Sequence, residues 1–443
     1  MSRVSTGANV VGHDGECRRG EAFLPAECRH PRRGAGARKP HAVLVSRLFR
    51  PEPAAASLAL GAIADGLVRE GFDVTVLTSR APQEFEVRDD PGLTVRRAPV
   101  LRDKAGYVRG YVQYMSFDIP LFFRLLLERR PDVVICEPPP TTGAVVRVVC
   151  TLRRVPYAYR AADLWSDAVK ETTAPPVVSA VLTRLENWVL NGASTLMTVH
   201  EGMEERLAGR GISARTRRLG FGIDTDVFTP EGQRVDTTGP LFVYAGTASE
   251  VHGAEIFVEA FRALLQRDPT ARLVFIGQGE SFAEIRSQAE SLPEGAVQVL
   301  GRMSPEQTAE WIRSSVATLA SVKPGPYGFA FPTKAFASAA CGTPVIYAGA
   351  EDAGRQVVQE GLGVAVPYDA DAVAQAMADL ALNESPAAAP AASQARSAPV
   401  ATAVRPATQL RAWALEHVSA RRLGQVAAAI INEIVAEGRS RRR

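Results

Sequence analysis

The chain has 443 residues, of which 46% are hydrophobic, and a formal net charge of +3. This length is sufficient for two or three domains with separate cores. The charge excess is small, and much of it lies near the two ends of the chain. It excludes the broad basic face that is typical of nucleic-acid-binding proteins, so we expect no nucleic-acid partner.

Cysteine usage and hydropathy indicate the cellular compartment. The five cysteines show neither a CxxC pair nor metal-ligand spacing, which predicts a reducing compartment and no metal site. No run of about 18 apolar residues occurs, and residues 1–40 lack the hydrophobic segment of a secretion signal. We therefore expect a cytoplasmic protein. Residues 1–40 are rich in Gly, Arg and Pro, and we expect them to form a disordered leader.

From residue 41 onward, short apolar segments alternate with amphipathic ones. Most of the apolar segments are continuous runs of Val, Ile and Leu, as expected for parallel strands that helices cover on both faces. The pattern predicts a first α/β domain at 41–223, with helices such as 57–70 and 117–130 and with strands at 42–49, 72–78, 93–99, 132–136, 157–160 and 195–200.

A second series of the same kind follows a polar stretch at 224–239 that is rich in turn formers and indicates a linker. This series predicts a second domain at 240–383, with strands at 241–245, 272–276, 297–300, 317–320, 344–347 and 364–366. The sequence therefore predicts two doubly wound domains that face a cleft.

The C-terminal part divides into two segments. Residues 384–407 are rich in Ala, Pro and Ser without an apolar period, which is typical of a flexible insertion. Residues 408–443 contain helical spacing of apolar residues over 409–437 and a basic tail. Gly424 is a candidate break within this helix.

One short segment indicates a function. Residues 331–346 predict a helix that opens at Pro332 and Thr333, closes at Gly342 and leads into a buried strand. A Thr that can cap the helix and Lys334 in its first turn would place free N–H groups and a cation at one point, which suits a phosphate.

This segment resembles the donor-nucleotide segment of family 4 glycosyltransferases, which have the two-domain GT-B fold. Six further segments resemble landmarks of that family and occur in the expected order: 48–56, 71–78, 130–135, 163–168, 222–228 and 274–279. Asp-Leu-Trp-Ser-Asp-Ala at 163–168 is similar to the segment found in the branch that builds bacterial surface polysaccharides.

The resemblance implies a retaining, metal-independent transferase that needs no cofactor beyond its substrate. It would move a sugar from a nucleotide-diphosphate sugar, with a UDP-sugar favoured, to an acceptor hydroxyl. The acceptor would be a small molecule or lipid-linked, in surface-polysaccharide or specialised-metabolite biosynthesis. The resemblance also implies that the last helix crosses back to the N-terminal domain, although packing in the second domain is an alternative.

The resemblance implies a set of donor-binding residues, with Lys334 first because departure of a nucleoside diphosphate needs positive charge at the phosphates. Each of three charged candidates also has an interpretation without a binding role. Lys334 would be a solvated lysine on a helix face, His252 an ordinary loop histidine and Arg302 an arginine in a helix-capping turn. The full donor set is Gly246, Thr247, His252, Gly277, Gly279, Arg302, Thr333 and Lys334.

The sequence departs from the family at two points. An Arg and a Lys usually hold the diphosphate, whereas the loop after the first strand of the second domain offers Thr247 and His252. Family members also carry a Glu for the ribose hydroxyls and often a second Glu upstream, and these positions are Ala337 and Phe329 here. Neither side chain can accept a hydrogen bond from ribose, so donor recognition must differ, weaken or be lost.

On the acceptor side, the resemblance implies a catalytic role for Asp163, which would orient the acceptor hydroxyl or accept its proton. The alternative is an N-cap of the following helix, for which Asp is well suited. Arg160 and Asp167 are second-rank candidates, and Arg50 and Glu52 lie in the acceptor-side loop after the first strand.

Residues 107–123 are rich in aromatic side chains, with Arg109 and Arg124 nearby. They suit either a peripheral contact with an anionic membrane or, more commonly, packing against the sheet. A catalytically degenerate GT-B protein that partners an active transferase is the main alternative function. A dehydrogenase is weaker because Gly277 and Gly279 are not continued as GxGxxG, and a GT-B epimerase resembles the N-terminal segments less well.

Overall fold

The computed structural model describes residues 38–52, 54–83, 85–87, 91–103, 106, 108, 110–170, 175–325, 333–383 and 404–440. By their contacts, residues Lys39–Arg443 form one compact unit. The predicted leader lies outside the described residues except for 38–40, and the predicted insertion lies outside them except for 404–407.

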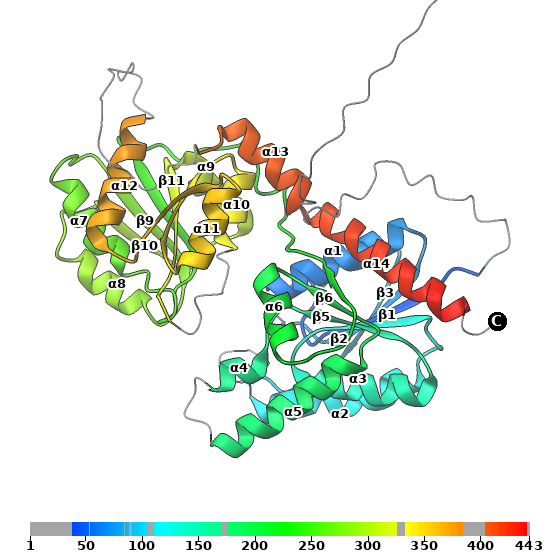
Figure 1. Ribbon diagram of the computed structural model, residues 1–443. Helices are drawn as coiled ribbons and strands as arrows, with labels where there is room; N and C mark the ends of the chain where they lie inside the picture. Colours follow the sequence, from blue (N-terminus) through cyan, green and yellow to red (C-terminus); the bar gives the residue numbers. More distant parts are fainter. Residues whose placement is uncertain are drawn as a thin grey trace, which may run out of the picture. The chain divides into compact units, whose positions relative to one another are not determined.

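The first sheet contains seven parallel strands in the order β3-β2-β1-β4-β5-β6-β7 (Figure 1). The order reverses between β1 and β4, as in doubly wound folds. The strands are β1 His41–Val45, β2 Asp73–Ser79, β3 Leu93–Ala98, β4 Val133–Cys136, β5 Tyr157–Ala161, β6 Thr195–Thr198 and β7 Thr216–Arg218. Strand β7 was not predicted, because this edge strand is only three polar residues, Thr-Arg-Arg, without an apolar run.

Helices cover both faces of this sheet, as the apolar strands predicted. Ala42 and Leu44 of β1 belong to one core with α1 and α14, whereas Val43 and Val45 belong to the other with α2, α3 and α5. Figure 1 shows α1 and α14 on one side of the sheet and α2, α3 and α5 on the other. The helices of this lobe are α1 Ala55–Arg69, α2 Tyr111–Leu127, α3 Pro140–Arg153, α4 Trp165–Lys170, α5 Pro176–Gly192 and α6 Glu201–Gly209. Helix α2 begins at Tyr111, earlier than the predicted 117.

The second sheet contains six parallel strands in the order β10-β9-β8-β11-β12-β13. They are β8 Leu241–Thr247, β9 Arg272–Gln278, β10 Val297–Leu300, β11 Ala317–Val322, β12 Val345–Gly349 and β13 Gly363–Val366. Helices α7 Ile256–Leu265, α8 Phe282–Ala289 and α12 Ala370–Asn383 cover one face, and α9 Pro305–Ser314, α10 Lys334–Ala340 and α11 Glu351–Gln359 cover the other. The predicted α/β class with two doubly wound parallel sheets is confirmed.

The C-terminal region forms two helices, α13 Ala407–His417 and α14 Ala420–Ser440. The predicted break at Gly424 is wrong, because the helix is interrupted at Val418 and Ser419 instead. There the chain pairs with Ile223, whose N–H donates to the Val418 carbonyl over 2.7 Å and whose carbonyl accepts from Ala420 N–H over 2.8 Å. A tertiary backbone contact, not a glycine, therefore sets the break.

Gly424 instead allows α14 to pack closely on α1. A Cβ atom at Gly66 of α1 would lie 2.2 Å from the Gly424 carbonyl oxygen, too close for any side chain. Leu423 and Ile431 of α14 lie in the core beneath α1. The last helix therefore completes the hydrophobic core of the first lobe.

We predict that Gly66→Ala destabilises the protein by about 3 kcal/mol, because the added methyl group forces two packed helices apart. Urea unfolding followed by circular dichroism measures the change. Gly209→Ala is the matched control, since Gly209 also lies in a helix but has nothing within 4 Å of a Cβ atom. This control is expected to shift the unfolding free energy by less than about 1 kcal/mol. Equal stability of the two variants would contradict the close contact.

Candidate functional site

A cavity of about 410 Å³ lies at the carboxyl end of the second sheet, where the loops after β8 and β9 meet the start of α10. Carboxyl ends of parallel strands are where doubly wound sheets bind ligands. Five predicted donor residues line this cavity: Gly246, Thr247, Gly277, Arg302 and Lys334. The structure thus brings together residues that are up to 88 positions apart in the chain, counted from 246 to 334.

Lys334, the first residue of α10, is half-buried, and its Nζ lies 5.0 Å from the centre of the Tyr244 ring. Its Cε occupies the space that a side chain at position 246 would need, since a Cβ at Gly246 would lie 2.8 Å from it. Burial lowers the pKa of Lys334 from 10.5 to about 8. The side chain is therefore still mainly cationic at pH 7 and ready to pair with an anion.

Thr333 does not cap α10, contrary to the prediction. Its backbone is already helical, with φ −58° and ψ −14°, and its side chain makes no capping hydrogen bond. The side chain is exposed and does not line the cavity. A cap needs an extended backbone that turns the hydroxyl toward the following N–H groups, and this conformation is absent at Thr333.

His252 and Gly279 do not line the cavity. The Nδ1 atom of His252 accepts the Ser249 N–H over 3.2 Å and lies 2.8 Å from the Ser249 hydroxyl. Burial, and then the charge of Lys334, lowers the pKa of His252 to about 4. His252 is thus neutral at pH 7 without a ligand, and a cationic role would require a bound phosphate to raise its pKa.

The wall one helical turn from Lys334 is apolar. Ala337 is 8% exposed and lines the cavity beside Ala245 and Ile276. Among the described residues, the lining includes no Asp or Glu, and its uncharged polar side chains are Thr247, Gln278, Thr308 and Thr318. The second position with an expected carboxylate, Phe329, lies outside the described residues. The cavity therefore suits an anion well and ribose hydroxyl groups less well.

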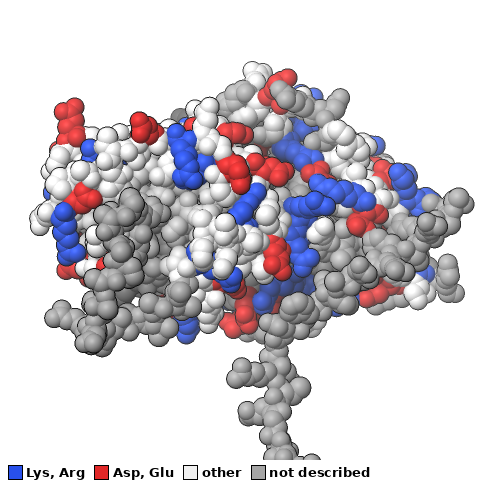
Figure 2. All heavy atoms as spheres, turned by 90° about the horizontal axis from the view of Figure 1, so that it is seen from above, with Lys and Arg blue, Asp and Glu red and all other residues white. Residues whose placement is uncertain are grey.

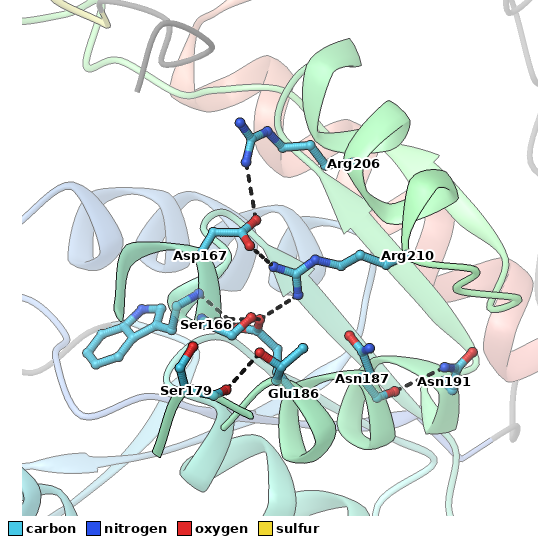
Figure 3. A network of polar contacts seen from close by, with 10 residues as sticks. Ser166, Asp167, Ser179, Glu186, Asn187, Asn191, Arg206 and Arg210 are labelled. Carbon is cyan, nitrogen blue, oxygen red and sulfur yellow. Dashed lines mark hydrogen bonds and ion pairs between the residues drawn. The ribbon is translucent and has the colours of Figure 1, made fainter. Parts of the chain in front are cut away.

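On the other lobe, Asp163 lies exposed in the loop between β5 and α4. The protein around it raises the pKa of Asp163 by partial desolvation; the nearby carboxylates of Glu186 and Asp167 add to this rise, and the Leu164 N–H opposes it. The N-cap alternative receives little support, because the N–H groups of Trp165 and Ser166 donate to Glu186 (Figure 3).

Sequence reasoning missed Glu186, which is 1% exposed on α5. Its carboxylate accepts the Ser166 hydroxyl over 2.6 Å and pairs with Arg210 at 2.8 Å (Figure 3). The signal in the sequence is a carboxylate on the same helical face as Val189 and Leu190, where a buried charge needs partners. Glu186 therefore fixes α4, and with it the loop that carries Asp163.

The other acceptor-side candidates form ion pairs within the lobe. Arg160 is 6% exposed and lies 3.1 Å from Glu137, and Asp167 contacts Arg206 at 3.1 Å and Arg210 at 2.6 Å. The remaining two candidates are also paired, Arg50 with Asp65 at 2.7 Å and Glu52 with Arg102 at 2.9 Å. These contacts give all four residues structural roles, and their contact with an acceptor stays a prediction.

Three further observations concern metal binding, membrane spanning and the distribution of surface charge. In the described part of the chain, no group of three or more His, Cys, Asp or Glu side chains could hold a metal ion. None of the helices in these described ranges is long and apolar enough to cross a bilayer. Figure 2 shows basic and acidic side chains interspersed over the described part of the face that it presents.

Comparisons with known proteins identify both lobes. A family model described as Glycosyl transferase 4-like domain matches residues 54–222, and one described as Glycosyl transferases group 1 matches residues 239–383. Together these models match most of the chain. A search of the curated proteins gives no significant match.

Solved structures of glycosyltransferases share the fold. Sucrose-phosphate synthase from Thermosynechococcus elongatus superposes with a TM-score of 0.67 at 16% identity, covering 90% of this chain and 100% of the other. HepE from Anabaena, in complex with UDP-glucose, gives 0.62 at 15% identity over 89% and 99%. WaaG, a glycosyltransferase involved in lipopolysaccharide biosynthesis, gives 0.58 at 14% identity over 89% and 99%. From these family matches and this fold, the chain belongs to the family 4 glycosyltransferases of the GT-B fold.

Proposed function

We propose that the protein transfers a sugar from a nucleoside-diphosphate sugar, with UDP as the favoured nucleotide, to an acceptor hydroxyl. The transfer would retain the anomeric configuration and need no metal, in surface-polysaccharide or specialised-metabolite biosynthesis. The observation that carries the proposal is Lys334, held beside Gly246 in a cavity at the carboxyl end of a parallel sheet.

The geometry suits stabilisation of a departing diphosphate. Among the described lining residues, the cations are Lys334 and Arg302, and Thr247 adds a hydroxyl donor. Charge develops on the diphosphate as the glycosidic bond breaks, and fixed cations stabilise it most where water is partly excluded. Binding of the diphosphate would raise the pKa of Lys334 and keep the lysine charged.

Two similar structures favour a UDP-sugar donor. HepE was solved with UDP-glucose and also with UDP alone. For the acceptor side we propose Asp163 as the residue that orients the acceptor hydroxyl or accepts its proton, since its pKa is raised and it is exposed beside the end of β5.

The alternative is a degenerate GT-B protein without turnover. The apolar wall at Ala337 favours it, because ribose hydroxyls would find no carboxylate among the described lining residues. Such a protein would keep its biological activity after loss of Lys334, whereas an active transferase would not.

We predict that Lys334→Ala weakens UDP binding by about tenfold to a hundredfold, the usual cost of losing a charge-assisted hydrogen bond. The wild-type affinity should also fall between pH 7.5 and 9.5, because Lys334 is cationic below its pKa of about 8 and neutral above it. In the variant this pH dependence should disappear. Isothermal titration calorimetry measures both effects.

Lys323→Ala serves as the control, since Lys323 pairs with Glu255 at 2.7 Å and does not line the cavity. Its UDP affinity should stay near the wild-type value. Unchanged binding in Lys334→Ala would contradict the proposed role of the lysine. Failure of the wild-type protein to bind UDP or any other nucleoside diphosphate would contradict the proposed function.

We predict that the wild-type protein binds UDP and 2′-deoxy-UDP with affinities within about threefold, since the described wall has no carboxylate for the 2′-hydroxyl. Ala337→Glu should raise the preference for UDP to about tenfold, because a carboxylate accepts that hydroxyl. Ala337→Leu, which adds bulk without charge, should not raise it. A strong wild-type preference for UDP would show that ribose is recognised elsewhere.

A further inference from the structure

The first lobe contains a second, larger cavity of about 900 Å³, with an almost entirely apolar wall. It lies between α2, α3, α4 and α5 and is lined by side chains such as Tyr114, Met115, Phe122, Trp165, Val181 and Leu185. Its wall includes Pro139 and Pro140, which follow β4, and Trp165, which follows β5. This cavity therefore begins at the carboxyl edge of the first sheet, near the loop that carries Asp163.

The apolar surface continues out of this cavity along two helices. Ile119 and Phe123 of α2 are 61% and 58% exposed, and Val177 and Val181 of α5 are 72% and 57% exposed, although all four line the cavity. Single exposed apolar side chains are common, but a contiguous patch beside a cavity marks a binding surface. An elongated apolar ligand fits this shape better than a compact one.

One buried carboxylate lies in this otherwise apolar wall. Asp118 is 1% exposed and lines it. One carboxylate oxygen accepts the Thr142 hydroxyl over 2.6 Å. Among the described residues, no donor completes a hydrogen bond to the other oxygen, although Thr141 lies nearby. The Arg47 guanidinium covers the Tyr114 ring at 4.1 Å and lies 5.8 Å from the Trp165 ring, so a cation lies against two of the rings that line the cavity.

Charge on the surrounding helices is one-sided. Helices α2, α3 and α5 carry two carboxylates, Asp118 and Glu186, and both are buried. Helix α4 adds Asp167, which pairs with Arg206 and Arg210. Helices α2, α3 and α5 also carry four arginines that are at least partly exposed: Arg124, Arg147, Arg153 and Arg184. An apolar surface that carries several arginines, and whose carboxylates are buried or paired with arginine, matches an anionic lipid.

We propose that this cavity binds the hydrocarbon chain of a lipid-linked acceptor whose head group carries phosphate. The inference rests on the proposed function for the statement that this lipid is the acceptor. The chain lies between α2 and α5, and the phosphate lies toward Arg47. The acceptor hydroxyl then reaches the loop that holds Asp163, only two residues before Trp165 in the chain.

Farnesyl phosphate, below its micelle concentration, is the probe for the full-length protein, and calorimetry is the measurement. Farnesyl phosphate should bind, farnesol more weakly, and inorganic phosphate alone not measurably. Val181→Gln should weaken binding about fivefold, because it places an amide in the apolar wall, and Ala144→Phe should weaken it at least about tenfold by filling the cavity. Both variants should bind UDP as the wild type does.

Leu152→Gln is the matched control, because Leu152 is 64% exposed, similar to Val181 at 57%, but does not line the cavity. Its affinity for farnesyl phosphate should stay within about twofold of the wild type. Equal losses in Leu152→Gln and Val181→Gln would indicate adsorption to the surface and overturn the proposal. Unchanged binding in Ala144→Phe, or binding of a compact aromatic compound such as naringenin but not of farnesyl phosphate, would also overturn it.

The UDP titration separates this proposal from the proposed function. If the wild-type protein does not bind UDP but binds farnesyl phosphate, the result contradicts nucleotide-sugar transfer and still supports the lipid site. If it binds UDP but not farnesyl phosphate, the result contradicts the lipid site and still supports the transferase function.

Discussion

The donor cavity depends on the close approach of two backbones at the carboxyl ends of β8 and β9. A Cβ at Gly277 would lie 2.1 Å from the Gly246 carbonyl oxygen, so β9 tolerates no larger residue at this contact. Both glycines have positive φ, +133° at Gly246 and +139° at Gly277, which L side chains rarely adopt. Because Gly246 has no side chain, Lys334 can lie over it. Gly277 thus permits the close approach of the two strands, and Gly246 leaves the space that the Lys334 side chain fills.

The sequence predicted the fold well because burial on both faces of a sheet leaves a strong local pattern. Continuous apolar strands separated by amphipathic helices require parallel pairing, and the observed cores on either side of β1 confirm this. Features that depend on distant partners were not predictable. The helix break at Val418 is set by pairing with Ile223, and the polar strand β7 has no apolar signal of its own.

The sequence allowed us to predict where the residues of the candidate site lie in the fold. It did not allow us to predict their capping interactions or their protonation states. Lys334 opens α10, Arg302 follows β10 and Gly246 lies near the end of β8, so topology alone places them at one edge. The prediction that Thr333 caps α10 is wrong because its backbone dihedrals are already helical. The neutral state of His252 depends on burial and on the charge of Lys334, which the sequence does not show. Glu186 was missed because its partners Ser166 and Arg210 lie on other helices, so that only the fold shows why a carboxylate is buried there.

The energetics of Lys334 explain why a half-buried lysine suits an anion site. A fall of its pKa from 10.5 to about 8 means that the folded protein disfavours the charged form by about 3 kcal/mol relative to water. Because the pKa of a basic group is lowered on folding, the cost applies in full below pH 8, where the lysine is charged in both the folded and the unfolded protein. The cost disappears as the pH rises toward 10.5, where the unfolded protein also loses the proton. A diphosphate beside the ammonium removes the cause of the cost, because it replaces the lost hydration with a direct charge contact. A fully solvated lysine would gain less from the same contact, since water already stabilises it. A half-buried Lys334 therefore gains more free energy from binding a diphosphate than a fully solvated lysine would.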